Sequence, residues 1–231
     1  NRSVSSKSGS ADVLEALNIP LDLDAARAVR QFEASNFTFL FAPAYNPAIA
    51  HVQPVRKALG ISTIFNTLGP LLSPGHPSLQ IMGIANPDQG QLIAEVFREL
   101  GRERALVVHG AGTDEIATHG TTQAWELRNG EIFNYQLTPE DLGIERHELA
   151  ELAGGDGAAN ALALRAVFSG LGKPAHVDAI AATAGAMFYL NGTTESIAIG
   201  VAHAKDLING GAVDEWLDIH ENANYAVGEE G

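Results

Sequence analysis

Two adjacent carboxylates, Asp114 and Glu115, follow a short apolar run that ends at Val108. The residues between this run and the pair, 109–113, contain two glycines and are typical of a loop. In open α/β sheets, ligands bind beyond the carboxyl ends of the strands. Mg²⁺ takes one or two protein carboxylates, keeps several waters and bridges to substrate phosphates. The pair therefore indicates a Mg²⁺ site, although an acidic pair at the start of a helix would give the same pattern.

The first twelve residues are rich in hydroxyl groups and lead directly into an apolar periodic run. Backbone N–H groups at a helix N-terminus are unpaired and carry the positive end of the helix dipole, so they suit a phosphate. A solvated, serine-rich connector with a helix cap explains the same residues. Because the segment opens the chain with no element before it, we expect that the chain is a fragment without its N-terminal part.

Arg56 is one of few cations in an acidic chain and lies on an expected helix, 47–59. The planar guanidinium offers two parallel donors that match a carboxylate. A Gly-Pro turn, Gly69-Pro70, follows shortly after this helix. Taken alone, an arginine in this pattern is by default interpreted as a surface residue of a helix.

The composition restricts the class of protein. The net charge of −14 opposes binding to nucleic acid or to an anionic membrane, because the long-range field repels phosphate polymers. No apolar run approaches the roughly 20 residues of a membrane span. The chain has no cysteine, so it has no disulfide and no thiolate nucleophile or metal ligand, which fits a cytoplasmic location.

The hydrophobic pattern alternates between strand and helix, which is typical of an α/β fold with a mainly parallel central sheet flanked by helices. An antiparallel hairpin is expected at Asn129-Gly130, because this dipeptide between alternating runs favours a tight turn. We expect a single domain over residues 1–231. The expected strands are 36–41, 79–85 and 105–108, and the main expected helices are 24–32, 47–59, 177–190 and 196–208.

Taken together, these segments resemble the anthranilate phosphoribosyltransferase family. The opening Asn-Arg-Ser-Val-Ser-Ser-Lys-Ser-Gly-Ser-Ala-Asp, the Pro-Val-Arg helix, Phe-Asn-Thr-Leu-Gly-Pro-Leu and Val-Val-His-Gly with its Asp-Glu pair occur in the family's order and spacing. The resemblance implies a nucleoside phosphorylase/phosphoribosyltransferase-like catalytic domain. It also implies transfer of the phosphoribosyl group of phosphoribosyl pyrophosphate to the amine of anthranilate, in tryptophan biosynthesis, by a homodimer.

The resemblance also implies roles for single residues, and it assigns none as a general acid or base. Asp114 and Glu115 match the Mg²⁺-binding carboxylates. Residues of the opening loop match those that hold phosphoribosyl pyrophosphate: Asn1, Arg2, Ser3, Val4, Ser5, Ser6 and Ser10. Four residues match those that contact anthranilate: Asn1, Arg56, Gly69 and Pro70.

Two features depart from the family pattern. The family's Lys-His-Gly before Asn1 and its Gly-rich pyrophosphate loop are absent from this chain, together with a helical domain. Asn46 stands where the family usually has His, and an amide side chain cannot titrate. Two other functions stay open: a pyrimidine nucleoside phosphorylase-like enzyme, and a non-catalytic paralogue that binds a nucleotide.

Overall fold

The computed structural model describes residues 7–21, 23–45, 65–221 and 223. The chain divides into two units. Unit 1 comprises Asn1–Pro74, Gly154–Ala166 and Ala212–Gly231, and unit 2 comprises Gly75–Ala153 and Val167–Gly211. The expectation of a single domain over the whole chain stays a prediction. No helix among the described residues is long and apolar enough to cross a bilayer.

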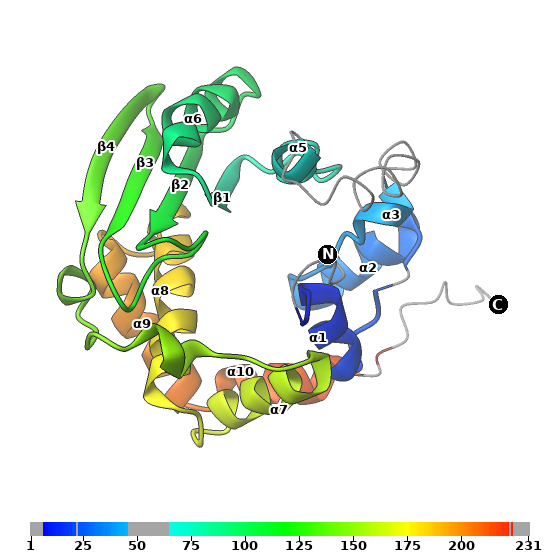
Figure 1. Cartoon of the computed structure of the whole chain (residues 1–231). Coiled ribbons are helices and arrows are strands. Elements are labelled where there is room, and N and C mark those ends of the chain that lie inside the picture. The colour runs from blue at the N-terminus through cyan, green and yellow to red at the C-terminus, as the bar shows by residue number, and fades with distance from the viewer. Residues whose placement is uncertain (1–6, 22, 46–64, 222, 224–231) are drawn as a thin grey trace. The chain divides into compact units, whose positions relative to one another are not determined.

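Unit 2 contains a four-stranded sheet with the order β1-β2-β3-β4 (Figure 1). The strands are β1 (Leu79–Gly83), β2 (Arg104–Gly110), β3 (Thr122–Arg128) and β4 (Glu131–Leu137). β1 and β2 are parallel, whereas β3 is antiparallel to both β2 and β4. The α/β class, the parallel pair and the hairpin are confirmed. The expected mainly parallel sheet is wrong for the described strands, since one of their three pairings is parallel.

The β3–β4 hairpin closes where the sequence predicts it. Arg128 pairs with Glu131, so only Asn129 and Gly130 lie in the turn. Both have positive φ, 53° and 77°. This left-handed pair is the type I′ geometry whose twist matches the flanking strands, and Asn and Gly adopt it at the least steric cost.

The expected strand 36–41 is not a strand. Asn36 ends helix α2 (Ala25–Ser35) in the left-handed conformation, with φ 56°, and the following residues have no strand pairing among the described residues. Phe37 instead packs edge-on against Trp216, with 5.6 Å between the ring centroids. Phe37 therefore serves packing against a helix in unit 1, and strand propensity alone cannot distinguish this use of an aromatic residue from strand pairing.

Helices cover both faces of the sheet (Figure 1). After a short 3₁₀ turn, Pro87–Gln89, helix α6 (Gly90–Glu99) packs against the face that carries Trp125. Helices α8 (Pro174–Leu190) and α9 (Ile197–Asn209) pack on the opposite face, which carries Ala124. The alternation follows from the period-two geometry of a strand, which sends neighbouring side chains to opposite sides.

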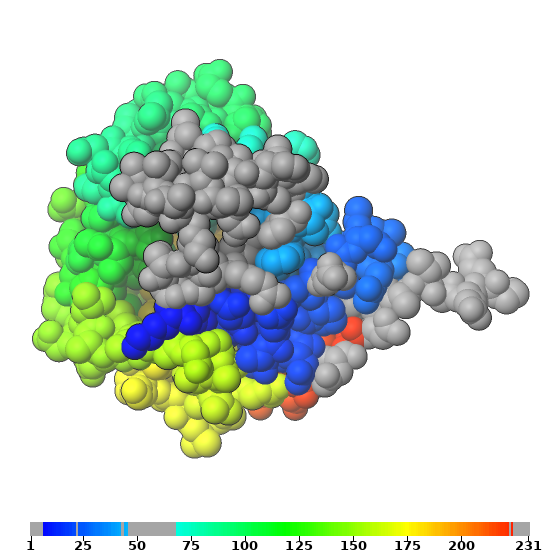
Figure 2. All heavy atoms as spheres, turned by 45° about the vertical axis from the view of Figure 1, so that its right-hand side comes forward, coloured from blue at the N-terminus to red at the C-terminus, as the bar shows by residue number. Residues whose placement is uncertain are grey.

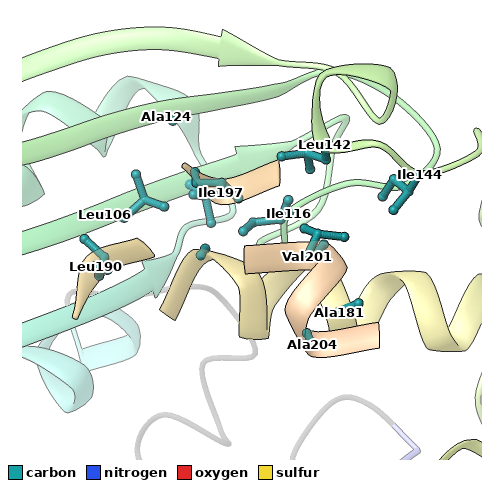
Figure 3. Close-up of a cluster of buried hydrophobic side chains, with 13 residues drawn as sticks. Leu106, Ile116, Ala124, Leu142, Ile144, Ala181, Leu190, Ile197, Val201 and Ala204 are labelled. Carbon is teal, nitrogen blue, oxygen red and sulfur yellow. The ribbon is translucent and has the colours of Figure 1, made fainter. Parts of the chain in front are cut away.

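The main core of unit 2 lies between the sheet and the α8–α9 pair (Figure 3). Complete burial of a leucine or isoleucine side chain stabilises the fold by about 1.5–3 kcal/mol relative to exposure. The small residues of α8 let the helices approach the sheet and each other closely. The buried members of this core are Leu106, Val108, Ile116, Ala124, Leu142, Ile144, Ala181, Ala182, Ala186, Leu190, Ile197, Val201 and Ala204.

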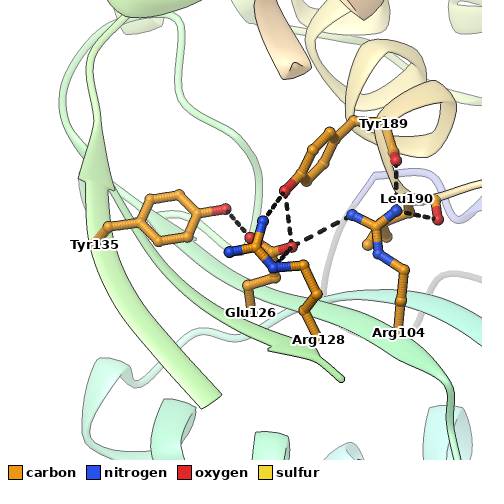
Figure 4. Close-up of polar contacts among 6 residues, drawn as sticks. All are labelled: Arg104, Glu126, Arg128, Tyr135, Tyr189 and Leu190. Carbon is orange, nitrogen blue, oxygen red and sulfur yellow. Dashed lines mark hydrogen bonds and ion pairs between the residues drawn. The ribbon is translucent and has the colours of Figure 1, made fainter. Parts of the chain in front are cut away.

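A buried polar cluster joins the sheet to the end of α8 (Figure 4). Glu126 on β3 is 3% exposed, and its carboxylate accepts hydrogen bonds from the hydroxyls of Tyr135 and Tyr189 at 3.0 and 2.9 Å. Arg104 pairs with Glu126 at 3.4 Å and donates to the carbonyls of Tyr189 and Leu190, both at 2.9 Å. Burial, followed by the Glu126 charge and hydrogen bond, raises the pKa of Tyr135, so its hydroxyl stays a donor.

The remaining helices among the described residues are α1 (Ser10–Ala16), α2 (Ala25–Ser35), α3 (Ala42–Tyr45), α5 (Phe65–Leu71), α7 (Gly157–Phe168) and α10 (Ala212–His220), with 3₁₀ turns at Glu140–Leu142 and Leu149–Leu152. The α1 segment, dark blue, reaches the surface in Figure 2. In unit 1, Trp216 of α10 donates from its indole N–H to the Ser35 carbonyl at 3.1 Å. Arg165 of α7 forms ion pairs with Asp218 and Glu221.

The α8–α9 contact yields a prediction for stability. A Cβ at Gly200 would lie 2.3 Å from the Gly185 carbonyl oxygen, so Gly200→Ala must separate the helices. We expect a loss of about 1–3 kcal/mol in the free energy of unfolding, measured by urea denaturation. Helix propensity alone favours alanine by about 1 kcal/mol, so a gain in stability would contradict the close contact. Ala202→Ser, at an exposed position of the same helix, is the control.

Candidate functional site

The candidate Mg²⁺ loop, defined as residues 111–121, leaves the carboxyl end of β2 and returns to β3. Its first turn is tight: Ala111 and Gly112 have φ of 45° and 90°, and Gly110 and Thr113 exchange backbone hydrogen bonds of 3.0 and 2.9 Å. His109 donates from Nδ1 to the Ile84 carbonyl at 2.9 Å, which ties the ends of β2 and β1 together. The loop therefore begins from a fixed edge, and this hydrogen bond gives His109 a structural role.

Two strand-end glycines let the backbone of the candidate Mg²⁺ loop approach the sheet. A Cβ at Gly83, the last residue of β1, would lie 1.7 Å from the Asp114 carbonyl oxygen. A Cβ at Gly110, the last residue of β2, would lie 2.3 Å from the Glu115 carbonyl oxygen. The Asp-Glu pair thus sits directly on the carboxyl edge of the parallel strand pair, where α/β proteins place their ligands.

The residues after the pair anchor the second half of the loop. Ile116 is 4% exposed and belongs to the core between the sheet and α8–α9. The Ala117 amide donates to the Thr122 hydroxyl at 2.8 Å. Thr118 is fully buried, and its carbonyl accepts from the His147 backbone amide at 2.9 Å. Buried contacts on one side of Glu115 and a tight turn on the other therefore hold the pair in place.

The two carboxylates influence each other. Both residues keep exposed surface. The protein around Glu115 nevertheless desolvates its carboxyl, and this desolvation, followed by the charge of Asp114, raises the Glu115 pKa. A divalent cation would relieve both unfavourable effects, because it supplies the opposite charge next to a partly desolvated carboxylate.

The two carboxylates fit a Mg²⁺ ion whose other ligands come from water and from a substrate. The two carboxylates are hard oxygen donors of the kind Mg²⁺ prefers. Among the described residues, no group of three or more His, Asp or Glu side chains is placed to hold a metal ion. A closed, all-protein metal centre is therefore not formed in this part of the chain, whereas a two-carboxylate site completed by water and phosphate matches what is present.

The other predicted site residues fall elsewhere in the chain. Ser10 is the first residue of α1 and is exposed, and Gly69 and Pro70 lie within α5; all three belong to unit 1. Asp114 and Glu115 belong to unit 2. Outside the described residues lie Asn46 and seven of the predicted site residues: Asn1, Arg2, Ser3, Val4, Ser5, Ser6 and Arg56.

Sequence reasoning missed a buried ionic cluster near the end of the candidate Mg²⁺ loop. His147 contacts Asp178 of α8 at 2.8 Å, and Asp178 contacts Lys205 of α9 at 2.6 Å. The three residues are far apart in the sequence and lie on separate elements, so no local spacing connects them. One signal was available: Asp178 is the one Asp, Glu, Lys or Arg residue in the Ala-rich helix α8, and such a residue is rarely buried without a partner.

The sequence profile of the glycosyl transferase family, a/b domain, matches residues 1–213. The chain belongs to this family.

Individual relatives are more specific. The chain is 79% identical over 225 residues to the anthranilate phosphoribosyltransferase of Corynebacterium aurimucosum. The matched region covers 97% of this chain and 65% of that protein. It is 69% identical over 226 residues to the enzyme of the same name from Corynebacterium diphtheriae, covering 98% of this chain and 66% of that protein. The chain thus spans slightly less than two thirds of the length of these curated relatives.

Solved structures share the fold. The crystal structure of anthranilate phosphoribosyltransferase from Thermus thermophilus matches with a TM-score of 0.89 and 39% identity, over 96% of this chain and 66% of that one. The Saccharomyces cerevisiae enzyme in complex with PRPP and Mg matches with a TM-score of 0.83 and 27% identity, over 93% of this chain and 62% of that one.

The close approach at Gly83 yields a prediction for the loop. Gly83→Ala keeps an ordinary backbone conformation but places a methyl group against the Asp114 carbonyl, so the candidate Mg²⁺ loop must move. We expect a loss of about 1–3 kcal/mol in the free energy of unfolding and faster amide hydrogen exchange over residues 113–117. Unchanged stability together with unchanged exchange would show that the loop does not depend on this contact.

Proposed function

We propose that this chain is the larger part of an enzyme that joins phosphoribosyl pyrophosphate to anthranilate. The anthranilate nitrogen forms a bond to the anomeric carbon of the ribose, the bond from that carbon to pyrophosphate breaks, and the nitrogen loses a proton. The products are N-(5-phosphoribosyl)anthranilate and pyrophosphate. The reaction is an intermediate step of tryptophan biosynthesis.

One observation carries the proposal: 79% identity over 97% of the chain to a protein of that name. The position of Asp114 and Glu115 at the carboxyl edge of β1 and β2 supports it independently, because a substrate with a pyrophosphate group needs a cation there. The amine of anthranilate is a neutral nucleophile, so the reaction demands no strong protein base. Catalysis then rests on positioning the two substrates and on stabilising the charge of the leaving group.

The chain's own residues divide these tasks. In the proposal, Asn1, Arg2, Ser3, Val4, Ser5, Ser6 and Ser10 hold phosphoribosyl pyrophosphate through backbone and hydroxyl donors. Arg56 orients anthranilate by its carboxylate, with Asn1, Gly69 and Pro70 against the ring. Asp114 and Glu115 hold Mg²⁺, which when bound neutralises charge on the pyrophosphate.

The proposal extends to assembly and location. The active form is a homodimer in the cytoplasm, as the family resemblance implies. Mixing phosphoribosyl pyrophosphate, anthranilate and Mg²⁺ with the full-length protein should release pyrophosphate in proportion to anthranilate consumed. Release of base from a pyrimidine nucleoside with free phosphate, without that reaction, would instead identify a nucleoside phosphorylase.

The acidic pair has a specific expected effect. In the full-length protein, replacing Asp114 and Glu115 together by alanine should lower turnover by about 100-fold or more, because several kcal/mol of charge stabilisation is lost. The matched control replaces another Asp-Glu pair, Asp214 and Glu215, which lie in the first turn of α10. Steady-state kinetics across Mg²⁺ concentrations measures the effect. Equal turnover and equal Mg²⁺ dependence in both double variants would remove the pair from the mechanism.

Arg56 has a different expected effect. Loss of a charge-assisted, bidentate contact costs about 1.5–3 kcal/mol, which is about 10- to 150-fold. Arg56→Ala should therefore raise the Michaelis constant for anthranilate more than that for phosphoribosyl pyrophosphate. Arg98→Ala, on the exposed side of α6, is the control and should change neither. The opposite ranking of the two constants would assign Arg56 to the phosphate substrate.

A further inference from the structure

We propose that His147, Asp178 and Lys205 form a positioning cluster that holds the candidate Mg²⁺ loop against α8 and α9. The inference rests on the proposed function in one respect, which is that Asp114 and Glu115 bind the cation. None of the three residues is proposed to touch substrate or metal. They act through the backbone of the loop.

The cluster is a continuous chain of contacts from helix to helix to loop. The Asp178 carboxylate is acceptor on both sides: Oδ1 lies 2.6 Å from the Lys205 ammonium and Oδ2 lies 2.8 Å from His147 Nε2. Asp178 is 6% exposed and His147 is 9% exposed, whereas the Lys205 side chain keeps 29% of its surface. The exposed Glu151 carboxylate lies 4.0 Å from His147 Nδ1 on the other side of the ring.

The cluster reaches the loop through a single backbone hydrogen bond. The His147 amide donates to the carbonyl of Thr118 at 2.9 Å, and Thr118 is fully buried. Thr118 follows Glu115 by three residues, with only Ile116 and Ala117 between them. With its ring clamped by Asp178, His147 cannot rotate away, and the Thr118 carbonyl keeps its donor. Ile144 and Ile116 belong to the same core, so apolar burial also anchors both segments.

Packing alone does not require charges at this place. The other buried residues of α8 and α9 are Ala, Gly, Val, Ile and Leu, and Phe188 of α8 packs edge-on against His203 of α9. Replacement of a buried ion pair by apolar residues of similar size is often neutral or stabilising. A hydrogen-bonded ionic cluster has, however, a fixed geometry that an apolar contact lacks. That property suits a support for a metal-binding loop, since partners outside the ligand shell typically set metal affinity by about 10- to 100-fold.

The test compares four variants of the full-length protein. His147→Leu removes the contact to Asp178, and His147→Gln restores a donor to it. Lys205→Met weakens the cluster from its partly exposed end if His147→Leu fails to fold. Glu126→Gln is the matched control, because it perturbs a different buried ionic cluster of unit 2, which holds the end of α8 and not the loop.

The first readout is amide hydrogen exchange over residues 113–118 without Mg²⁺ or substrate. We expect exchange about tenfold or more faster in His147→Leu and Lys205→Met, a return toward the parent rate in His147→Gln, and no selective change in Glu126→Gln. Equal acceleration in His147→Leu and Glu126→Gln, or failure of His147→Gln to restore the rate, would overturn the positioning role.

The second readout is the Mg²⁺ concentration that gives half-maximal turnover. It should rise about tenfold or more in His147→Leu and Lys205→Met, with the Michaelis constant for anthranilate unchanged. A rise in the anthranilate constant alone would also overturn the role. If the parent protein forms no phosphoribosyl anthranilate, the proposed function fails, and the exchange measurement still decides whether the cluster holds the loop.

Discussion

The parallel pairing of β1 with β2 is the constraint on which the candidate site depends. It brings two strand ends, Gly83 and Gly110, to one edge of the sheet. Both ends are glycine, and at both positions a Cβ would collide with the backbone of Asp114 or Glu115. The backbone of Asp114 and Glu115 can therefore lie directly against the two strand ends. With a larger residue at either position, the strand order would stay the same, but the backbone of the candidate Mg²⁺ loop would have to move away from the strand ends.

Helix α8 takes part in two ionic clusters of unit 2, one near its C-terminus and one in its first half. Near its C-terminus, Arg104 binds the last carbonyls of the helix and joins them to Glu126 on the sheet. In its first half, Asp178 binds His147 and Lys205. The C-terminal end of α8 is thus fixed to the sheet, and its first half contacts His147, whose backbone amide donates to the candidate Mg²⁺ loop at Thr118.

Local sequence signals predicted the elements that depend on local geometry. The Asn129-Gly130 turn lies where turn chemistry predicts it, and the expected helix 196–208 corresponds closely to α9. The Asp-Glu loop was also located, because a strand end followed by glycines is a local pattern. The segment 36–41 was mispredicted since strand formation needs a partner, and the His147 cluster was missed since its members meet only through tertiary packing.

The charge of the chain sets a final condition on how such a site can work. A net charge of −14 repels a substrate that carries several phosphate charges, and anthranilate is an anion as well. Asp114 and Glu115 make the local field more negative still, and burial already raises the pKa of Glu115. Without a cation this arrangement opposes the proposed substrates. In the proposed function, Mg²⁺ held by the same two carboxylates would make this place attractive to pyrophosphate. The negative charge that argues against binding of polymeric phosphate is therefore consistent with binding of a small phosphate compound together with a metal ion.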